Sequence, residues 1–248
     1  MTALAVASET VRVEQIMGMP IVVEVRDEDA DPRTLDEVFD WFRRVDETFS
    51  TYKPASEISR LARGELALED AALQVQDVLR RCEELRLETR GYFDAEATGR
   101  LDPSGFVKGW SVDRATSMLD EAALREHAVS AGGDMRLRGG PWRVGIEHPR
   151  ERDRVAAVVA ATDLAVATSG AYARGEHVVD PHTGRPPSGV LSVTVTGPDL
   201  ATADAYATAA FAMGGEAAAQ WVAHLNGYEA MIVLEDEVVL TTPGFPDD

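Results

Sequence analysis

The hydrophobic pattern of the chain alternates between short strand-like runs and longer helical segments. Val11–Val13 and Ile21–Val25 are runs rich in β-branched residues on either side of the turn Met17–Pro20, so the chain is predicted to begin with a hairpin. After Asp31–Pro32, apolar residues recur at helical spacing as far as Phe49, with Asp and Arg residues between them. This pattern predicts an amphipathic helix that covers a sheet.

Further helical and strand-like segments follow along the rest of the chain. Apolar residues at helical spacing predict one helix from about Asp70 to Thr89, stopped by Gly91, and another from Gly109 to Leu124. The remaining predicted elements are strands at Ala128–Ser130, Met135–Leu137, Trp142–Ile146, Val155–Ala160, Leu164–Thr168 and Leu191–Val195, helices at Thr202–Met213 and Glu216–Leu225, and a hairpin of Ala230–Leu234 with Val238–Thr241. Because the strands come in hairpins and meanders without strict βαβ alternation, the predicted fold class is α+β.

No internal repeat or low-complexity linker divides the chain. We therefore predict a flexible N-terminal segment at residues 1–10 and a single domain at residues 11–248. Hydrophobic residues make up 45% of the 248 positions, which is enough for an ordinary core. The single cysteine excludes an intramolecular disulfide and a cysteine-based metal site.

The formal net charge of −19 limits the classes of partner. Such a charge repels polyphosphate backbones, so neither nucleic acid nor an anionic membrane surface is an expected partner. An anionic small substrate would need a bound cation, a lysine or helix N-terminal N–H groups to hold it. No apolar run approaches the roughly 20 residues of a membrane span, and the N-terminal residues lack the basic start of a signal peptide. We expect a cytoplasmic protein without a membrane anchor.

Polar turns in the second half of the chain are the first candidates for chemistry. Thr168–Gly170 and His177–Gly184 are followed by Asp204 and Thr208, which lie four residues apart on a predicted helix and therefore share a face. A carboxylate and a hydroxyl on one face suit a cation and a phosphate. Each turn alone also fits an ordinary loop, but their order favours a binding site.

Two earlier segments add candidate ligand contacts. In Asp102–Asp113 an acidic turn leads to Lys108 at the predicted start of a helix, where an ammonium group and N–H groups hold an anion; a solvated lysine fits equally well. Gly91–Asp94 places two aromatic residues after a helix, either as a stacking wall for a planar ring or as a cap on the core. Phosphate-loop, dinucleotide-binding, hydrolase-elbow and zinc-helix motifs are absent from the sequence.

Taken in order, these motifs resemble those of the ApbE family of FAD:protein FMN transferases. The segments that carry the resemblance are Met17–Gly18, Phe49–Tyr52, Ser56–Ile58, Gly91–Asp94, Lys108–Trp110, Val112–Asp113, Gly132–Asp134, Thr168–Gly170, His177–Gly184, Ala203–Asp204 and Thr208–Gly214. The resemblance implies an α+β fold similar to tandem T-fold-like halves packed as one globular unit. It also implies Mg²⁺-dependent transfer of the FMN moiety of FAD to a Ser or Thr hydroxyl of a target flavoprotein, with release of AMP. The chain departs from the family pattern at Ala95–Arg100, where a segment is shortened, and at Gly105–Val107, before the lysine.

Roles for individual residues follow from the resemblance. It implies contacts to FAD from Met17, Tyr52, Tyr92, Phe93, Asp94, Asp102 and Lys108. The metal would be held by Asp204, Thr208 and a backbone carbonyl near Gly105, a hard oxygen set suited to Mg²⁺. His177 joins Asp204 as a catalytic candidate, because an imidazole with a pKa of about 6.5 suits a general base. An FAD pyrophosphatase with water as acceptor, and a non-catalytic flavin-binding protein, remain alternatives.

Overall fold

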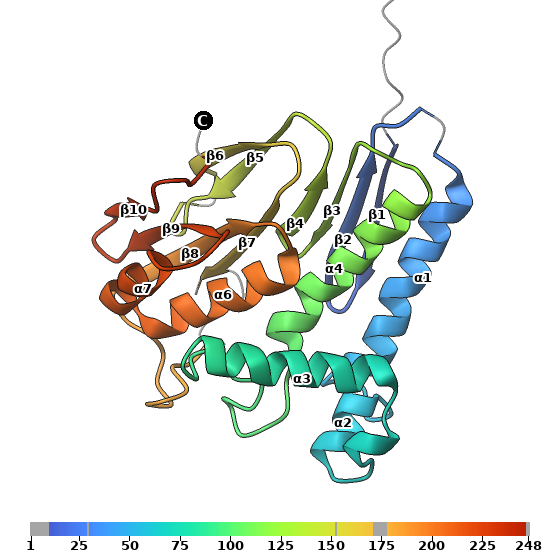
Figure 1. The fold of residues 1–248 in the computed structure, drawn as a ribbon, viewed down its shortest axis with the longest axis horizontal. Coiled ribbons are helices and arrows are strands. Elements are labelled where there is room, and N and C mark those ends of the chain that lie inside the picture. Colours follow the sequence, from blue (N-terminus) through green and yellow to red (C-terminus); the bar gives the residue numbers. More distant parts are fainter. Residues whose placement is uncertain (1–9, 29, 152, 171–177, 247–248) are drawn as a thin grey trace, which may run out of the picture.

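The computed structural model of the protein describes residues 10–28, 30–151, 153–170 and 178–246. In chain order its elements are β1 (Thr10–Ile16), β2 (Met19–Val25), α1 (Pro32–Phe49), α2 (Glu57–Ala62), the 3-10 helix η1 (Leu68–Asp70), α3 (Leu73–Glu88), α4 (Ser104–Glu121), β3 (His127–Ala131), β4 (Asp134–Arg138), β5 (Trp142–Glu147), β6 (Val155–Ala161), β7 (Ala165–Gly170), β8 (Val190–Gly197), α6 (Leu200–Met213), α7 (Gly215–Val222), β9 (Glu229–Leu234) and β10 (Val239–Thr241). Figure 1 shows a broad twisted sheet with helices packed against it.

The sheet contains eight strands in the order β1-β2-β3-β4-β7-β8-β9-β10, and each neighbouring pair is antiparallel. β1 and β2 form the predicted N-terminal hairpin, whose two turn residues Met17 and Gly18 have φ angles of 54° and 72°. Two left-handed residues are what a tight hairpin turn between twisted strands requires. The predicted last hairpin is present as β9 and β10. The α+β prediction is confirmed.

Helices α1, α4 and α6 lie over one face of the sheet, and α3 crosses below the lower ends of α1 and α4 (Figure 1). α1 begins where Asp31 accepts a hydrogen bond from the Arg33 N–H, with Pro32 as its first residue. Its inward side chains, all buried as predicted, are Leu35, Val38, Phe39, Phe42, Val45 and Phe49. This stripe packs α1 against the sheet and against α4.

The β5–β6 hairpin packs against the other face of the sheet. Buried Trp142, Val144 and Ile146 alternate with exposed residues along β5, as the period of a half-buried strand requires. They form a hydrophobic cluster that includes Leu137 of β4. Because Leu137 follows Arg136, whose side chain faces α4, it points away from the helices. Both faces of the central strands are therefore covered.

The structure corrects the predicted start of the third helix. α4 begins at Ser104 rather than Gly109, and Asp102 Oδ1 accepts a hydrogen bond from the Ser104 N–H at 3.0 Å. Two glycines in this segment, each about 1 kcal/mol less favourable than alanine in a helix, hid the helix from the sequence pattern. Lys108 is consequently the fifth residue of α4 and does not stand at a helix N-terminus.

Three smaller differences concern boundaries. The short helix α2 was not predicted; Ser56 caps it by accepting a hydrogen bond from the Ser59 N–H. The second predicted helix begins at Leu73 as α3, after the separate 3-10 helix η1, and its apolar residue Leu87 is 65% exposed rather than buried. Thr10 belongs to strand β1 rather than to a flexible terminus, and residues 1–9 lie outside the described part. None of the helices in the described ranges has the length and apolar character needed to span a membrane.

Candidate functional site

A cavity of about 340 Å³ opens where α4, α6 and β7 meet two loops. Its lining residues are Tyr52, Tyr92, Phe93, Asp94, Ala95, Ala97, Thr98, Asp102, Ser104, Gly105, Lys108, Gly132, Thr168, Ser169, Gly170, Val178, Val179, Pro181, Asp204 and Thr208. A second hollow of about 590 Å³ shares Tyr52 with it but contains no buried ionisable side chain. The smaller cavity is therefore the candidate site.

The floor of the cavity holds a lysine between two buried carboxylates. Lys108 Nζ is ion-paired with Asp134 and lies 3.3 Å from Asp204 Oδ1, and both carboxylate side chains are only 3% exposed. The three residues come from α4, β4 and α6. Asp134 is held in turn by the Thr168 N–H of β7, which donates to its Oδ1 at 2.8 Å. One positive charge thus faces two negative ones inside the protein.

Asp204 has a carboxylate oxygen that could coordinate a cation. Burial raises the pKa of its carboxyl group and the nearby Asp134 raises it further, while Lys108 and the Gly109 N–H oppose the rise. Its Oδ2 atom is buried without a hydrogen-bond partner in the described part of the chain. Because a buried carboxylate oxygen without a partner is costly, this atom fits a cation that enters the cavity.

Hydroxyl side chains and the first turn of α4 line the same cavity as Asp204. Thr208 lies one turn further along α6, and its Oγ1 is 3.3 Å from the Ser169 Oγ of β7. A Cβ added at Gly105 would stand 3.7 Å from Thr208 Oγ1, so the first turn of α4 lies close to α6 here. Within the described ranges no three His, Cys, Asp or Glu side chains are grouped as a metal would require. A cation would therefore need hydroxyl and carbonyl oxygens besides carboxylate, and the three residues expected to supply them, Asp204, Thr208 and Gly105, all line this cavity.

The aromatic residues predicted to contact FAD differ in their exposure. Tyr52 is 95% exposed at the edge of the cavity, and Tyr92 is half-buried in its wall. Phe93 is 3% exposed and packs in the hydrophobic cluster between α3 and α4. Most of its ring therefore caps the core, which was one of the two alternatives for this segment. Asp94 and Asp102 line the same wall, and each accepts a hydrogen bond from a backbone N–H two residues further on.

One predicted residue is not brought to this cavity. Met17 packs with the hydrophobic clusters under the N-terminal hairpin and is not among the lining residues, because its place in the tight turn directs it toward the core. His177 lies outside the described residues.

The structure also adds residues that sequence reasoning left without a role. Asp134 was noted as part of a glycine turn, but its partnership with Lys108 depends on the packing of β4 on α4. His182 contacts the wall: its Nε2 is 3.0 Å from the Arg90 carbonyl oxygen, and its ring meets Tyr92 edge-on at 4.6 Å between centroids. Only the three-dimensional structure joins these distant segments.

Comparison with known proteins shows which family the chain resembles. A family model described as the ApbE family matches residues 17–99 and 95–232. A FAD:protein FMN transferase of Vibrio cholerae is 38% identical over 131 residues, which cover 47% of this chain and 39% of that protein. A FAD:protein FMN transferase of Treponema pallidum is 32% identical over 176 residues, which cover 62% of this chain and 49% of that protein. The chain thus spans less than half the length of these curated relatives.

The fold of this protein matches solved structures over nearly the whole chain. A flavin transferase ApbE from Vibrio cholerae aligns with a TM-score of 0.84 and 23% identity, covering 96% of this chain and 98% of that one. An ApbE protein from Thermotoga maritima aligns with a TM-score of 0.84 and 22% identity, and the alignment covers 97% of this chain and 100% of that one. At this level of identity the likeness demonstrates a shared fold.

Proposed function

The chain belongs to the ApbE family, and we propose that it transfers the FMN moiety of FAD to a Ser or Thr hydroxyl of an acceptor flavoprotein, releasing AMP. The name that the curated relatives carry, FAD:protein FMN transferase, supports this activity. The acceptor and the metal dependence are part of the proposal.

The observation that carries the proposal is the buried Asp204 Oδ2 atom, which has no hydrogen-bond partner in the described structure and belongs to a residue that lines the cavity. Lys108 beside it supplies a positive charge at the place where a pyrophosphate would need one in a protein of net charge −19. A binder of neutral ligands has no use for two buried carboxylates around one lysine, because their burial is costly. The arrangement therefore favours phosphoryl chemistry.

Mg²⁺ fits the oxygen atoms present. Asp204 and Thr208 would hold it together with a backbone carbonyl near Gly105. When bound, the ion would neutralise the pyrophosphate and orient it for attack. Tyr52, Tyr92 and Asp94 are proposed to contact the flavin, with Phe93 supporting Tyr92 from the core and Asp102 bordering the start of α4.

The reaction requires one bond to form and one to break. The acceptor hydroxyl oxygen bonds to the phosphorus on the flavin side, the bond from that phosphorus to the bridging oxygen breaks, and AMP leaves with that oxygen. His177 is proposed to take the hydroxyl proton. Lys108, held by Asp134, would stabilise the negative charge that develops on the phosphate oxygens.

The test is incubation of the purified protein with FAD and Mg²⁺, with and without a flavoprotein that carries a candidate Ser or Thr acceptor. We expect AMP release together with an FMN-sized mass gain on the acceptor. AMP with free FMN in both arms would instead identify an FAD pyrophosphatase, and FAD binding without AMP would contradict both activities.

Matched variants separate the roles of the side chains. Thr208→Val is expected to abolish transfer, whereas Thr116→Val, which removes a buried hydroxyl without a hydrogen-bond partner in the described structure, keeps it. His177→Ala is expected to slow transfer without changing FAD affinity, and His224→Ala on an exposed position is its control. Normal transfer by His177→Ala would exclude His177 as the base.

A further inference from the structure

Helix α4 is joined to β4 by two ion pairs of opposite polarity. Lys108 of α4 pairs with Asp134 of β4, and Asp113 of α4 lies 3.7 Å from the guanidinium of Arg136 of β4. Asp134 and Arg136 are two residues apart on a strand, so both side chains point toward α4. The stretch of α4 between Lys108 and Asp113 is thereby fixed on the sheet.

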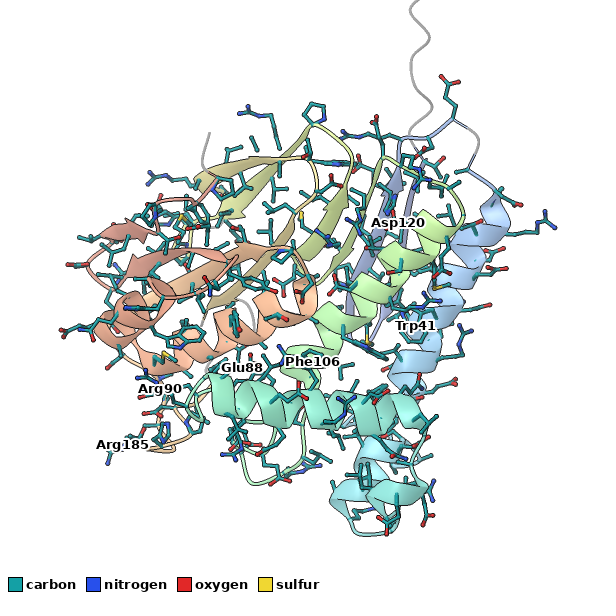
Figure 2. All side chains as sticks on the ribbon, in the orientation of Figure 1. Trp41, Glu88, Arg90, Phe106, Asp120 and Arg185 are labelled. Carbon is teal, nitrogen blue, oxygen red and sulfur yellow. The ribbon has the colours of Figure 1, made fainter. Side chains whose placement is uncertain are left out.

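The same stretch is held from the side of α1. The Trp41 indole N–H donates a hydrogen bond of 2.9 Å to the carbonyl oxygen of Ser111. Figure 2 shows Trp41 beside α4 and Phe106 at the lower end of α4, next to α3. Besides α6, the elements β4, α1 and α3 therefore contact α4.

Asp113 also connects α4 to α6. Its Oδ1 and Oδ2 accept hydrogen bonds from the Leu200 N–H at 3.0 and 2.9 Å, and its Oδ2 accepts one from the Ala201 N–H at 2.8 Å. These are the first two N–H groups of α6, which have no partner inside the helix. The local cap of α6, Asp199, accepts a hydrogen bond from the next group, the Thr202 N–H, and its other carboxylate oxygen accepts one from the Tyr228 hydroxyl.

The two helices touch where Asp113 makes this connection. A Cβ added at Gly109 would stand 2.5 Å from the Leu200 carbonyl oxygen and 2.8 Å from Ala201 Cα, so backbone meets backbone. Gly109 and Asp113 are four residues apart and share one face of α4. Together they fix where α6 begins relative to α4.

The start of α6 determines where the site residues lie. Asp204 and Thr208 are four and eight residues beyond Leu200, about one and two helical turns away. A small rotation of α6 at Leu200 would move Asp204 away from Lys108, now 3.3 Å distant. Asp113 itself does not line the cavity, so it acts at a distance from the substrate.

We infer that Asp113 is a positioning residue of this site: its carboxylate clamps the first turn of α6 to α4 and so holds Asp204 and Thr208 in place for the metal. This inference rests on the proposed function, because it concerns the same metal and phosphate site. The clamp is a contact between two elements, not the local cap of one helix.

The test measures Mn²⁺ affinity by electron paramagnetic resonance in the presence of FAD, with AMP release as a second readout. Asp113→Ala is expected to weaken Mn²⁺ binding by about tenfold or more, the range for groups that support metal ligands. Asp113→Asn, which keeps an oxygen acceptor, is expected to restore much of the affinity. Asp199→Ala removes the local cap of the same helix together with the acceptor of the Tyr228 hydroxyl; it is the matched control and is expected to leave the affinity nearly unchanged.

The outcomes are distinguishable. Unchanged Mn²⁺ affinity and kcat in Asp113→Ala, or an equal loss in Asp199→Ala, would overturn the inference and leave Asp113 a stabilising residue only. Failure of the unaltered protein to bind Mn²⁺ would overturn the proposed metal site and the inference with it. If Asp113→Ala does not fold, Gly109→Ala takes its place: its methyl group must separate α4 from α6, and unchanged affinity there would contradict the clamp.

Discussion

At the scale of single residues, the site depends on an imbalance of buried charge. Lys108 faces both Asp134 and Asp204, so one ammonium group neutralises one carboxylate and leaves the other without a counter-charge. In an interior of low dielectric such an arrangement is costly. The proposed metal ion would supply the missing positive charge and offset this cost.

Lys108→Met is expected to destabilise the fold strongly. It leaves two buried carboxylates without their counter-charge, for which removal of one partner typically costs about 3–5 kcal/mol. Urea unfolding of the variant measures the loss. Adding Asp134→Asn is expected to recover part of it, and a single variant as stable as the unaltered protein would contradict the charge argument.

Asp204→Asn is expected to separate stability from activity. Removing the carboxylate relieves repulsion from Asp134, so the melting temperature stays equal or rises. Loss of the proposed metal ligand removes several kcal/mol of transition-state stabilisation, which corresponds to a rate of AMP release lower by about 100-fold or more. Calorimetry and an AMP assay on the same preparation check both parts. A large fall in melting temperature would identify Asp204 as a structural residue instead.

At the scale of elements, the crossing of α4 and α6 organises the site. The interpretation of Asp102–Asp113 as a loop leading to a helix missed the first turn and a half of α4, because Gly105 and Gly109 lower local helix propensity. Gly109 is required by tertiary structure instead, since a Cβ there would overlap the backbone of α6. Propensity counts only local terms, and so it could not predict this helix start.

The Asp113 clamp also predicts a pH dependence. Burial raises the pKa of Asp113 from 3.8 to about 6, although N–H groups of Leu200 and Ala201 oppose the rise. The pKa of Asp113 is higher in the folded state than in the unfolded state, so the folded state binds the proton more tightly. The stability that this proton binding contributes is complete below pH 3.8 and is lost as pH rises through 6. Asp113→Asn removes it, so the stability of the variant relative to the unaltered protein should improve by about 2 kcal/mol between pH 4 and pH 8.

Urea unfolding of both proteins at the two pH values tests this expectation. Glu121→Gln, which removes an exposed carboxylate at the end of the same helix, serves as the control because Glu121 pairs with Arg114 and not with the first turn of α6. A stability difference between Asp113→Asn and the unaltered protein that is the same at both pH values would contradict the raised pKa.

At the scale of the whole molecule, the charge of −19 opposes binding of an anionic substrate, and Lys108, which also faces Asp134 and Asp204, offsets only part of this repulsion. FAD affinity in EDTA is therefore expected to increase several-fold as salt is raised from low to physiological strength, because salt screens the long-range repulsion. With Mg²⁺ present the salt dependence should be weaker. Fluorescence titration measures both; affinity in EDTA that falls as salt rises would contradict the repulsion argument.

The sequence by itself determined the α+β class, most helices and strands, the acidic charge and the order of motifs that resembles the ApbE family. Helical and strand periods are local properties, so the buried stripe of α1 and the two terminal hairpins could be predicted from spacing alone. Tertiary structure alone decided that Asp134 pairs with Lys108, that Met17 packs against the hydrophobic clusters, and that Asp113 accepts hydrogen bonds from the start of α6. The reason is physical: these contacts depend on strand register and on how two helices cross, and neither is contained in the spacing of residues along one segment.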